Sequence, residues 1–347
     1  MTMKKLIRSS VAGLTAYTPG EQPRVAGLVK LNTNENPYPP SPAVAQVLRD
    51  FAAESLRLYP DPMCNALRGR IAELAGCARE QVFVGNGSDE VLRLAMRAFT
   101  QPGGTVAAFE PTYSLYPVLA AADELKYRTV PLPEDFSWVM PPADLDAGLF
   151  CLANPNAPTG VFYPLESIRG FCRAFAGVAL IDEAYVDFAG GRDCLELAKT
   201  LPNVLVCRTL SKSYSLAGLR LGWAIGSPEL IGALYKLKDS YNVDGLAQAV
   251  ALAALGDVGW MQTNARRIVA TRERVAAKLA ERGFRVTPSA ANFLWVLPPA
   301  GTPAADLFTQ LREKKFLVRY FPGPRTGDFL RITIGADGQM DALLAAI

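Results

Sequence analysis

The chain has 347 residues, of which 50% are hydrophobic and 20% charged; it carries a formal net charge of +3 and contains no histidine. Without imidazole, a Ser-His-Asp triad, a Cys-His pair and a His-ligated zinc site are excluded, so acid–base chemistry near neutral pH must use a carboxyl, tyrosine, cysteine or lysine side chain. A net charge so close to zero gives no electrostatic case for binding nucleic acid or an anionic membrane.

The amino-terminal stretch MTMKKLIRSS has two lysines but no apolar run after them, so it lacks the pattern of a signal peptide. No apolar run approaches the ~20 residues that cross a membrane. The six cysteines include no C-x-x-C pair, which indicates reduced, mostly buried thiols. The sequence therefore predicts a soluble cytoplasmic protein with no metal site.

Residues 1–30 are polar and rich in turn formers, which indicates an arm rather than a packed element. Ser41 and Pro42 suit the N-cap and first position of a helix over 42–51. Its apolar face would carry Val44, Val47, Leu48 and Phe51. Short apolar strands then alternate with helical or turn segments, which favours an α/β domain with a largely parallel sheet. The strand candidates are QVFVG, TVAAF, YRTVPL, GLFCLA, VALIDEA and VLVCRT.

The second half of the chain has a different pattern. Helices are predicted over 228–239, 244–256 and 258–283, and strands and helices without strict alternation follow, which favours an α+β unit. We place the domain boundary near residue 245. The predicted division is an arm over 1–30, a large domain over 31–245 and a small domain over 246–347.

A first candidate site follows the strand VFVG, where Gly87, Ser88 and Asp89 open directly onto a helix. Free backbone N–H groups and the helix dipole make such a point suitable for a phosphate. An ordinary strand-to-helix turn with an N-cap would look the same. The motif is neither G-x-G-x-x-G nor a Walker loop, so it does not favour nucleotide binding.

A second candidate is ALIDEAYVDF, in which Asp182 ends an apolar strand and Tyr185 follows three residues later. Ligands bind at the carboxyl ends of strands in open α/β sheets. A buried carboxylate there needs a partner, because an isolated buried charge is costly. A solvated strand end or a structural ion pair is the alternative interpretation.

A third candidate, VCRTLSKSYSLAGLRLG, contains Ser211, Lys212 and Arg220 after another apolar strand. Neighbouring cations and desolvation lower the pKa of a lysine and provide an amine that can attack a carbonyl. An arginine can clamp a phosphate through paired hydrogen bonds. Lys212 alone could be an exposed loop lysine, but the three motifs together match the functional groups of pyridoxal phosphate (PLP).

These motifs, with AYTPGEQP, KLNTNENPYPPSP, YPDP, NPNAPTG and LRITIG, resemble the histidinol-phosphate aminotransferase family, in the class II branch of the PLP aminotransferases. The resemblance covers nearly the whole chain. It implies an aspartate-aminotransferase-like fold type I, in which a large domain with a mostly parallel seven-stranded sheet is followed by a smaller α+β domain. It also implies a homodimer with shared active sites.

The resemblance assigns roles to the cofactor-binding residues. Lys212 would form the Schiff base and carry the proton shift, Asp182 would hold the ring nitrogen protonated, and Tyr185 would hydrogen-bond the ring hydroxyl. Tyr113 would stack on the ring, and Tyr59 would reach the phosphate in the neighbouring subunit. The residues that would hold the phosphate are Gly87, Ser88, Asp89, Ser211 and Arg220.

The resemblance also implies a substrate-binding set. Arg331 would receive the carboxylate of an amino acid or 2-oxo acid, and Arg319 a substrate phosphate. Tyr17 and Asn36 would close over the substrate. Both arginines alternate with apolar residues on predicted strands, so a surface or salt-bridge role is the alternative for either.

One position departs from the family pattern. The family has Asn directly before Pro-Thr-Gly, where it hydrogen-bonds the ring hydroxyl, and this chain has Ala157. Losing such a bond costs on the order of 1 kcal/mol. We predict that Asn156 turns inward to replace it.

The implied reaction is transamination between L-histidinol phosphate and 2-oxoglutarate in histidine biosynthesis, with PLP as cofactor. An aromatic or other amino-acid aminotransferase and a threonine-phosphate decarboxylase share these motifs and stay open as alternatives. A DNA-binding regulator is disfavoured, because the residues before the core leave no room for a helix-turn-helix. A nicotinamide oxidoreductase lacks its glycine fingerprint.

Overall fold

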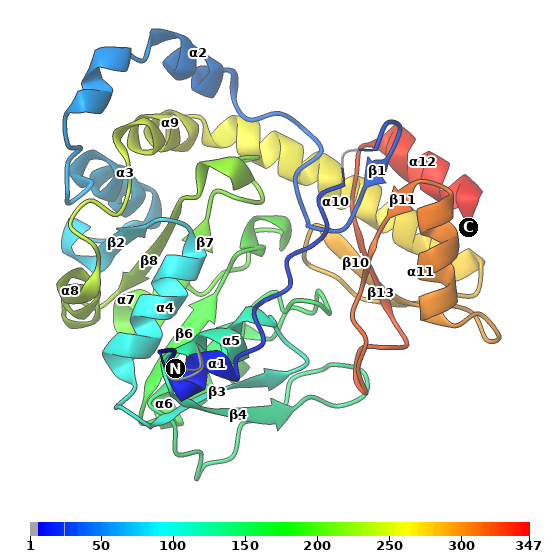
Figure 1. The fold of residues 1–347 in the computed structure, drawn as a ribbon, viewed down its shortest axis with the longest axis horizontal. Coiled ribbons are helices and arrows are strands. Elements are labelled where there is room, and N and C mark those ends of the chain that lie inside the picture. The colour runs from blue at the N-terminus through cyan, green and yellow to red at the C-terminus, as the bar shows by residue number, and fades with distance from the viewer. Residues whose placement is uncertain (1–5, 24) are drawn as a thin grey trace.

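The computed structural model describes residues 6–23 and 25–347, so the predicted arm begins outside the described residues (Figure 1). The largest sheet has seven strands in the order β2-β8-β7-β6-β5-β3-β4. Every pairing in it is parallel except the two made by β8. The strands are β2 (Val82–Gly85), β3 (Thr105–Glu110), β4 (Lys126–Pro131), β5 (Leu149–Ala153), β6 (Val178–Asp182), β7 (Val204–Thr209) and β8 (Gly222–Gly226).

The predicted mostly parallel seven-stranded sheet is confirmed, and so are all six strands read from apolar runs. The apolar runs did not reveal the seventh strand, β8, which pairs antiparallel with β7. The connection between β7 and β8 carries Ser211, Lys212 and Arg220.

Side chains of the large sheet alternate between two buried faces, as expected for strands covered on both sides. In β5, Leu149 and Cys151 belong to one apolar cluster, and Phe150 and Leu152 to the other. The helices over the first face are α4 (Ser88–Phe99), α5 (Leu115–Ala122) and α8 (Pro228–Leu237). Those that pack into the second cluster include α3 (Asn65–Ala75), α6 (Leu165–Ala174) and α7 (Leu195–Thr200).

The predicted helix over 42–51 is confirmed as α2 (Pro42–Asp50), and the Oγ of Ser41 accepts a hydrogen bond from the backbone N–H of Ala43 at 3.2 Å. Its apolar face packs only in part, because Val44 is buried and Leu48 is 55% exposed. Helix α9 (Gly245–Gly256) packs against α2 and α3.

The carboxyl-terminal part is built on a four-stranded antiparallel sheet in the order β12-β13-β10-β9. Its strands are β9 (Arg285–Thr287), β10 (Phe293–Leu297), β12 (Arg319–Tyr320) and β13 (Leu330–Thr333). Its helices are α10 (Val258–Glu281), α11 (Ala304–Glu313) and α12 (Asp337–Ala346). The predicted smaller α+β unit is thus present, while its exact boundary near 245 stays a prediction. No helix in the described ranges is both long and apolar enough to cross a membrane.

The amino-terminal segment connects the two parts of the molecule. Its short helix α1 (Ser9–Ala12) lies against α5, and its strand β1 (Val29–Lys30) pairs in parallel with β11 (Phe316–Leu317). Figure 1 shows the blue chain running from the large sheet to the small one between these two elements. Four short 3₁₀ helices complete the described elements: η2 (Ala53–Arg57), η3 (Arg79–Gln81), η4 (Val186–Phe188) and η5 (Ala217–Leu219).

Candidate active site

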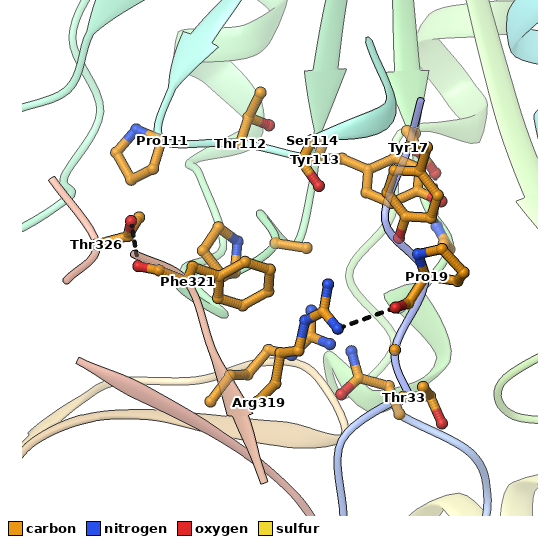
Figure 2. Close-up of a pocket in the computed structure, with 18 of the residues that line it drawn as sticks. Tyr17, Pro19, Thr33, Pro111, Thr112, Tyr113, Ser114, Arg319, Phe321 and Thr326 are labelled. Carbon is orange, nitrogen blue, oxygen red and sulfur yellow. Dashed lines mark hydrogen bonds between the residues drawn. The ribbon is translucent and has the colours of Figure 1, made fainter. Parts of the chain in front are cut away.

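A cavity of about 570 Å³ lies where the two sheets and the amino-terminal segment meet. The carboxyl ends of β6 and β7 form one wall, and the loop after β12 and residues 32–34 form others. Figure 2 shows Arg319 and Phe321 facing the side of the cavity that carries Thr112 and Tyr113. Parallel strands end at one edge of a sheet, so motifs that follow different strands converge here.

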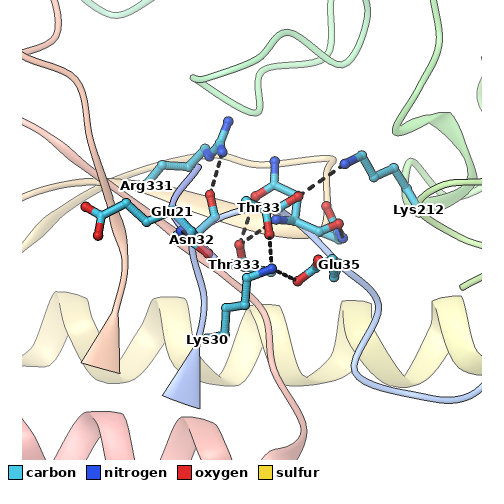
Figure 3. A network of polar contacts seen from close by, with 10 residues as sticks. Glu21, Lys30, Asn32, Thr33, Glu35, Lys212, Arg331 and Thr333 are labelled. Atoms are coloured by element: carbon cyan, nitrogen blue, oxygen red, sulfur yellow. Dashed lines mark hydrogen bonds and ion pairs between the residues drawn. The ribbon is translucent and has the colours of Figure 1, made fainter. Parts of the chain in front are cut away.

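Asp182 enters the cavity from the end of β6, and Lys212 enters it from the loop that follows the neighbouring strand β7. The Nζ of Lys212 donates to the carbonyl of Thr33 at 3.2 Å (Figure 3). Asp182 is buried, accepts from the Tyr116 hydroxyl at 2.9 Å and from the Ala184 N–H at 3.2 Å. Burial raises the pKa of Asp182 to about 6, because a desolvated carboxylate is disfavoured. The cavity therefore holds an amine and a carboxyl group whose charge is only weakly stabilised by the protein.

Tyr185 stands between these groups and the small sheet. Its hydroxyl accepts from the Nδ2 of Asn34 at 2.9 Å, and its ring meets that of Phe293 edge-on at 5.1 Å. The Nζ of Lys212 lies 5.8 Å from the centre of the Tyr185 ring. A phenol hydroxyl and an amine thus line the same side of the cavity.

A cradle for an anion lies at the start of α4. Gly87 has φ +81°, and a Cβ there would lie 2.6 Å from the Nη2 of Arg220, so a larger residue would displace the guanidinium. Arg220 also approaches the Ser211 hydroxyl at 3.5 Å and the Asp89 carboxylate at 3.3 Å. Ser88 begins the helix, where backbone N–H groups favour an anion. The five residues predicted to hold a phosphate are therefore close together.

Tyr113 and Tyr17 form an aromatic wall. Their ring centres are 6.1 Å apart at 71°, and the ring of Tyr113 also meets that of Tyr116 at 5.5 Å. Burial, together with the Asp89 carboxylate, raises the pKa of Tyr113. Both residues line the cavity.

Arg319 and Arg331 are directly paired across β12 and β13. The guanidinium carbon of Arg331 lies 5.3 Å from the ring centre of Phe293 and 5.2 Å from that of Phe321, and burial lowers the pKa of Arg331. Its Nη2 donates to the Asn32 carbonyl at 2.9 Å, while its Nε is buried without a partner among the described residues.

Arg319 donates to the carbonyls of Thr18 and Pro19 at 2.9 and 3.3 Å. Two guanidinium groups thus line one cavity without a carboxylate partner in the described ranges.

Two predicted residues lie outside the cavity of this chain. The Nδ2 of Asn36 donates to the carbonyls of Lys212 and Ser213 at 3.1 and 3.0 Å, so Asn36 holds the turn behind the lysine and does not line the cavity. Tyr59 is 81% exposed and stacks on Tyr241, outside the cavity of its own chain.

The prediction that Asn156 turns inward is wrong in this structure. Its Nδ2 donates to the Pro111 carbonyl and the Thr159 hydroxyl, both at 3.0 Å, and its Oδ1 accepts from Thr112 at 2.9 Å. All its polar atoms are therefore engaged in holding the loop. The residue that lines the cavity at this turn is Ala157.

Several residues at the site were not singled out from the sequence. Three consecutive residues of the run NTNEN contact cavity side chains: Asn34 contacts Tyr185, Thr33 contacts Lys212 and Asn32 contacts Arg331. The polarity of this run is a signal that could have marked it as part of the site. Tyr116, by contrast, occupies a helix position that reads as ordinary core. In the described ranges, no group of three or more His, Cys, Asp or Glu residues is arranged to hold a metal ion.

The chain matches the family model for aminotransferases of class I and II over residues 26–347. A histidinol-phosphate aminotransferase from Chromohalobacter salexigens is 47% identical over 349 aligned residues, which cover 99% of each chain. The crystal structure of a histidinol-phosphate aminotransferase from Sinorhizobium meliloti, in complex with pyridoxal-5'-phosphate, is similar with a TM-score of 0.83 and 28% identity over 92% of this chain and 89% of that one. An L-threonine-O-3-phosphate decarboxylase from Porphyromonas gingivalis has the same fold, with a TM-score of 0.81 and 20% identity over 92% and 98% of the two chains.

Proposed function

Because the chain belongs to the class I and II aminotransferase family, we propose that it transfers an amino group between L-histidinol phosphate and 2-oxoglutarate, with PLP as its cofactor. The products are imidazole-acetol phosphate and glutamate, and the reaction belongs to histidine biosynthesis. The observation that carries the proposal is the pair of guanidinium groups, Arg319 and Arg331, beside Lys212 in one cavity. A cytoplasmic location stays part of this proposal.

The cavity fits PLP in three respects. Asp182 is a buried carboxyl without an ion pair among the described residues, and a protonated ring nitrogen would complete it. Ser88, Ser211 and Arg220 line the cavity at the start of α4, where hydroxyl, backbone N–H and guanidinium groups suit a phosphate, and a Cβ at Gly87 would displace the guanidinium. Lys212 contributes an amine that, among the described residues, donates a hydrogen bond to one carbonyl. PLP, when bound, supplies an aldehyde that accepts an amino group and a ring that withdraws electrons.

The roles proposed for the chain follow from these positions. Lys212 would attach to the cofactor and move a proton at its Nζ, and Asp182 would hold a proton on the ring nitrogen. Tyr185 would donate a hydrogen bond to the ring hydroxyl, and Tyr113 would cover the ring. The residues proposed to hold the phosphate are Gly87, Ser88, Asp89, Ser211 and Arg220, with backbone N–H groups contributing at the start of α4.

The two amino donors of this reaction differ in charge distribution, because histidinol phosphate carries a phosphate and glutamate carries two carboxylates. Guanidinium groups bind either anion through paired N–H donors. The buried Nε of Arg331, which has no partner among the described residues, supports a role in binding such an anion. Arg319 uses one N–H of each terminal nitrogen on the carbonyls of Thr18 and Pro19, so the other N–H groups of its guanidinium can bind an anion.

A comparison of amine donors tests this function. With 2-oxoglutarate as acceptor, we expect kcat/KM for histidinol phosphate to exceed those for phenylalanine and tyrosine by at least ~10²-fold, since two guanidinium groups in the cavity favour a phosphate-bearing donor. Threonine phosphate, which also carries a phosphate, is the third donor compared. Glutamate formation is the measurement. A preference for an aromatic amino acid would overturn the assignment, and release of carbon dioxide from threonine phosphate without glutamate would identify a decarboxylase.

We also propose a homodimer in which Tyr59 reaches the phosphate site of the other subunit. The supporting observation is an exposed apolar patch formed by Leu56, Leu58, Tyr59 and Tyr241, which are 64%, 60%, 81% and 44% exposed. Large exposed apolar side chains that lie together are typical of a contact surface. The rings of Tyr59 and Tyr241 stack at 4.3 Å, which presents a flat aromatic surface.

The dimer is tested by two substitutions in the patch. Wild-type protein should have twice the 37.4 kDa mass of the chain by light scattering, and Leu58→Asp should give the single-chain mass, because a charge would be buried in the contact. Tyr59→Phe keeps the apolar surface, so it should stay dimeric and bind PLP roughly tenfold more weakly. A monomeric wild type, or unchanged PLP binding in Tyr59→Phe, would contradict the proposal.

A further inference from the structure

The cavity wall beside Tyr185 carries a methyl group where the resemblance leads us to expect an amide. Ala157 lines the cavity, and the side chain of Asn156 is engaged by Pro111, Thr112 and Thr159. A ligand hydroxyl at this wall therefore lacks an amide donor from the turn. It depends more strongly on the hydroxyl of Tyr185.

Tyr185 receives a hydrogen bond from a buried side chain that comes from far away in the sequence. The Nδ2 of Asn34, a residue 1% exposed, lies 2.9 Å from the Tyr185 hydroxyl. A phenol hydroxyl has one proton and can also accept. Because it accepts from Asn34, its proton is free to be donated into the cavity that Tyr185 lines.

The orientation of the Asn34 amide follows from its second partner. The hydroxyl of Thr333 accepts from the backbone N–H of Asn34 at 3.0 Å and donates to the Oδ1 of Asn34 at 2.9 Å. With its one proton given to Oδ1, Thr333 holds the amide oxygen on its own side and directs Nδ2 at Tyr185. The opposite orientation would place Oδ1 against the phenol and draw its proton away from the cavity.

The backbone at Asn34 is held in a conformation that few residues adopt. Its φ is +57°, in the left-handed region that asparagine and aspartate tolerate better than most side chains. Its carbonyl accepts from the Nδ2 of Asn292 at 3.0 Å. The preceding residues Asn32 and Thr33 bind Arg331 and Lys212 through their carbonyls, so this segment contacts three cavity side chains in succession.

We propose that Asn34 is a positioning residue, which fixes the hydroxyl of Tyr185 as a hydrogen-bond donor to the cofactor's ring hydroxyl and so offsets the amide missing at Ala157. This inference rests on the proposed function, because it requires PLP in the cavity. It assigns a role to a side chain that does not touch the reacting atoms.

A double-mutant cycle tests the proposal. Asn34→Asp replaces the donor with an acceptor at nearly constant shape, and Asn34→Gly removes the side chain while keeping the left-handed backbone accessible. Each is made alone and together with Tyr185→Phe, and the Kd of PLP for the cofactor-free protein is measured by absorbance titration. We expect PLP to bind about tenfold more weakly in Asn34→Asp and about fivefold more weakly in Asn34→Gly. In the Tyr185→Phe background, the same changes should alter Kd less than twofold, since interacting groups are not additive.

The controls separate positioning from folding. Glu124→Gly changes another left-handed residue, outside the cavity, and should leave Kd unchanged. The absorption maximum of bound PLP should move in Asn34→Asp and not in Glu124→Gly. Equal losses with and without Tyr185→Phe would overturn the inference while leaving the proposed function intact. Failure of the wild-type protein to bind PLP would overturn both.

Discussion

Replacing Lys212 by arginine is expected to lower kcat for transamination at least ~10⁴-fold, because both covalent attachment and proton transfer are lost. Arginine keeps the positive charge at the end of β7, but its guanidinium does not give up a proton near neutral pH. Lys212 is the one lysine that lines the cavity in the described part of the chain, so we expect no nearby amine to substitute. Steady-state glutamate formation is the measurement.

A chemical readout separates the loss of the amine from a general loss of activity. Borohydride treatment of the PLP-bound wild type should attach the cofactor to the peptide that contains Lys212, as detected by mass spectrometry, and Lys212→Arg should remain unmodified there. Lys199→Arg is a matched control, because Lys199 is ion-paired with Glu196 on α7 and does not line the cavity. Labelling of a different lysine in the wild type would contradict the assignment.

The fold was predictable from the sequence where burial leaves a strong pattern. A strand covered on both faces, such as β5 or β6, must be apolar throughout, so it is recognised as a short apolar run. The strand β8 begins and ends in glycine and directly follows the motif at Arg220, so its five residues were not separated from that motif. The pairing of β1 with β11 involves two residues on each strand, too few to produce a periodic signal.

The candidate site was predictable where its residues directly follow such strands. Asp182 is the last residue of β6, and Lys212 comes three residues after β7, so recognising each strand also located each side chain. Asn34 lies 151 positions from Tyr185, and only the tertiary fold brings the two together. Asn156 and Ala157 are neighbours in one turn, where the local backbone decides which of them faces the cavity, and a sequence pattern does not specify that.

The charge of Asp182 is expected to lower the stability of the cofactor-free protein while serving its activity. Burial raises the pKa of this carboxyl from 3.8 to about 6 in the folded chain. The folded state thus holds the proton more tightly than the unfolded state does, so stability falls as pH rises from about 4 to about 6 and stays lower above that range. Asp182→Asn removes this titration, and the amide can still bond with Tyr116 or the Ala184 N–H.

We therefore expect Asp182→Asn to raise the free energy of unfolding of the cofactor-free protein on the order of 2 kcal/mol at pH 8, with little change at pH 4. The same substitution should lower kcat roughly 10³-fold, because a neutral amide does not stabilise a protonated ring nitrogen. Urea unfolding at the two pH values and glutamate formation measure the two effects.

The control Asp50→Asn, at an exposed position that ends α2, should show neither effect. If Asp182→Asn is less stable than the wild type at pH 8, the buried carboxylate does not lower the free energy of unfolding. If it keeps full activity, Asp182 does not act on the ring. A more stable but nearly inactive protein would mean that this carboxylate is retained for its charge, which the bound cofactor must compensate.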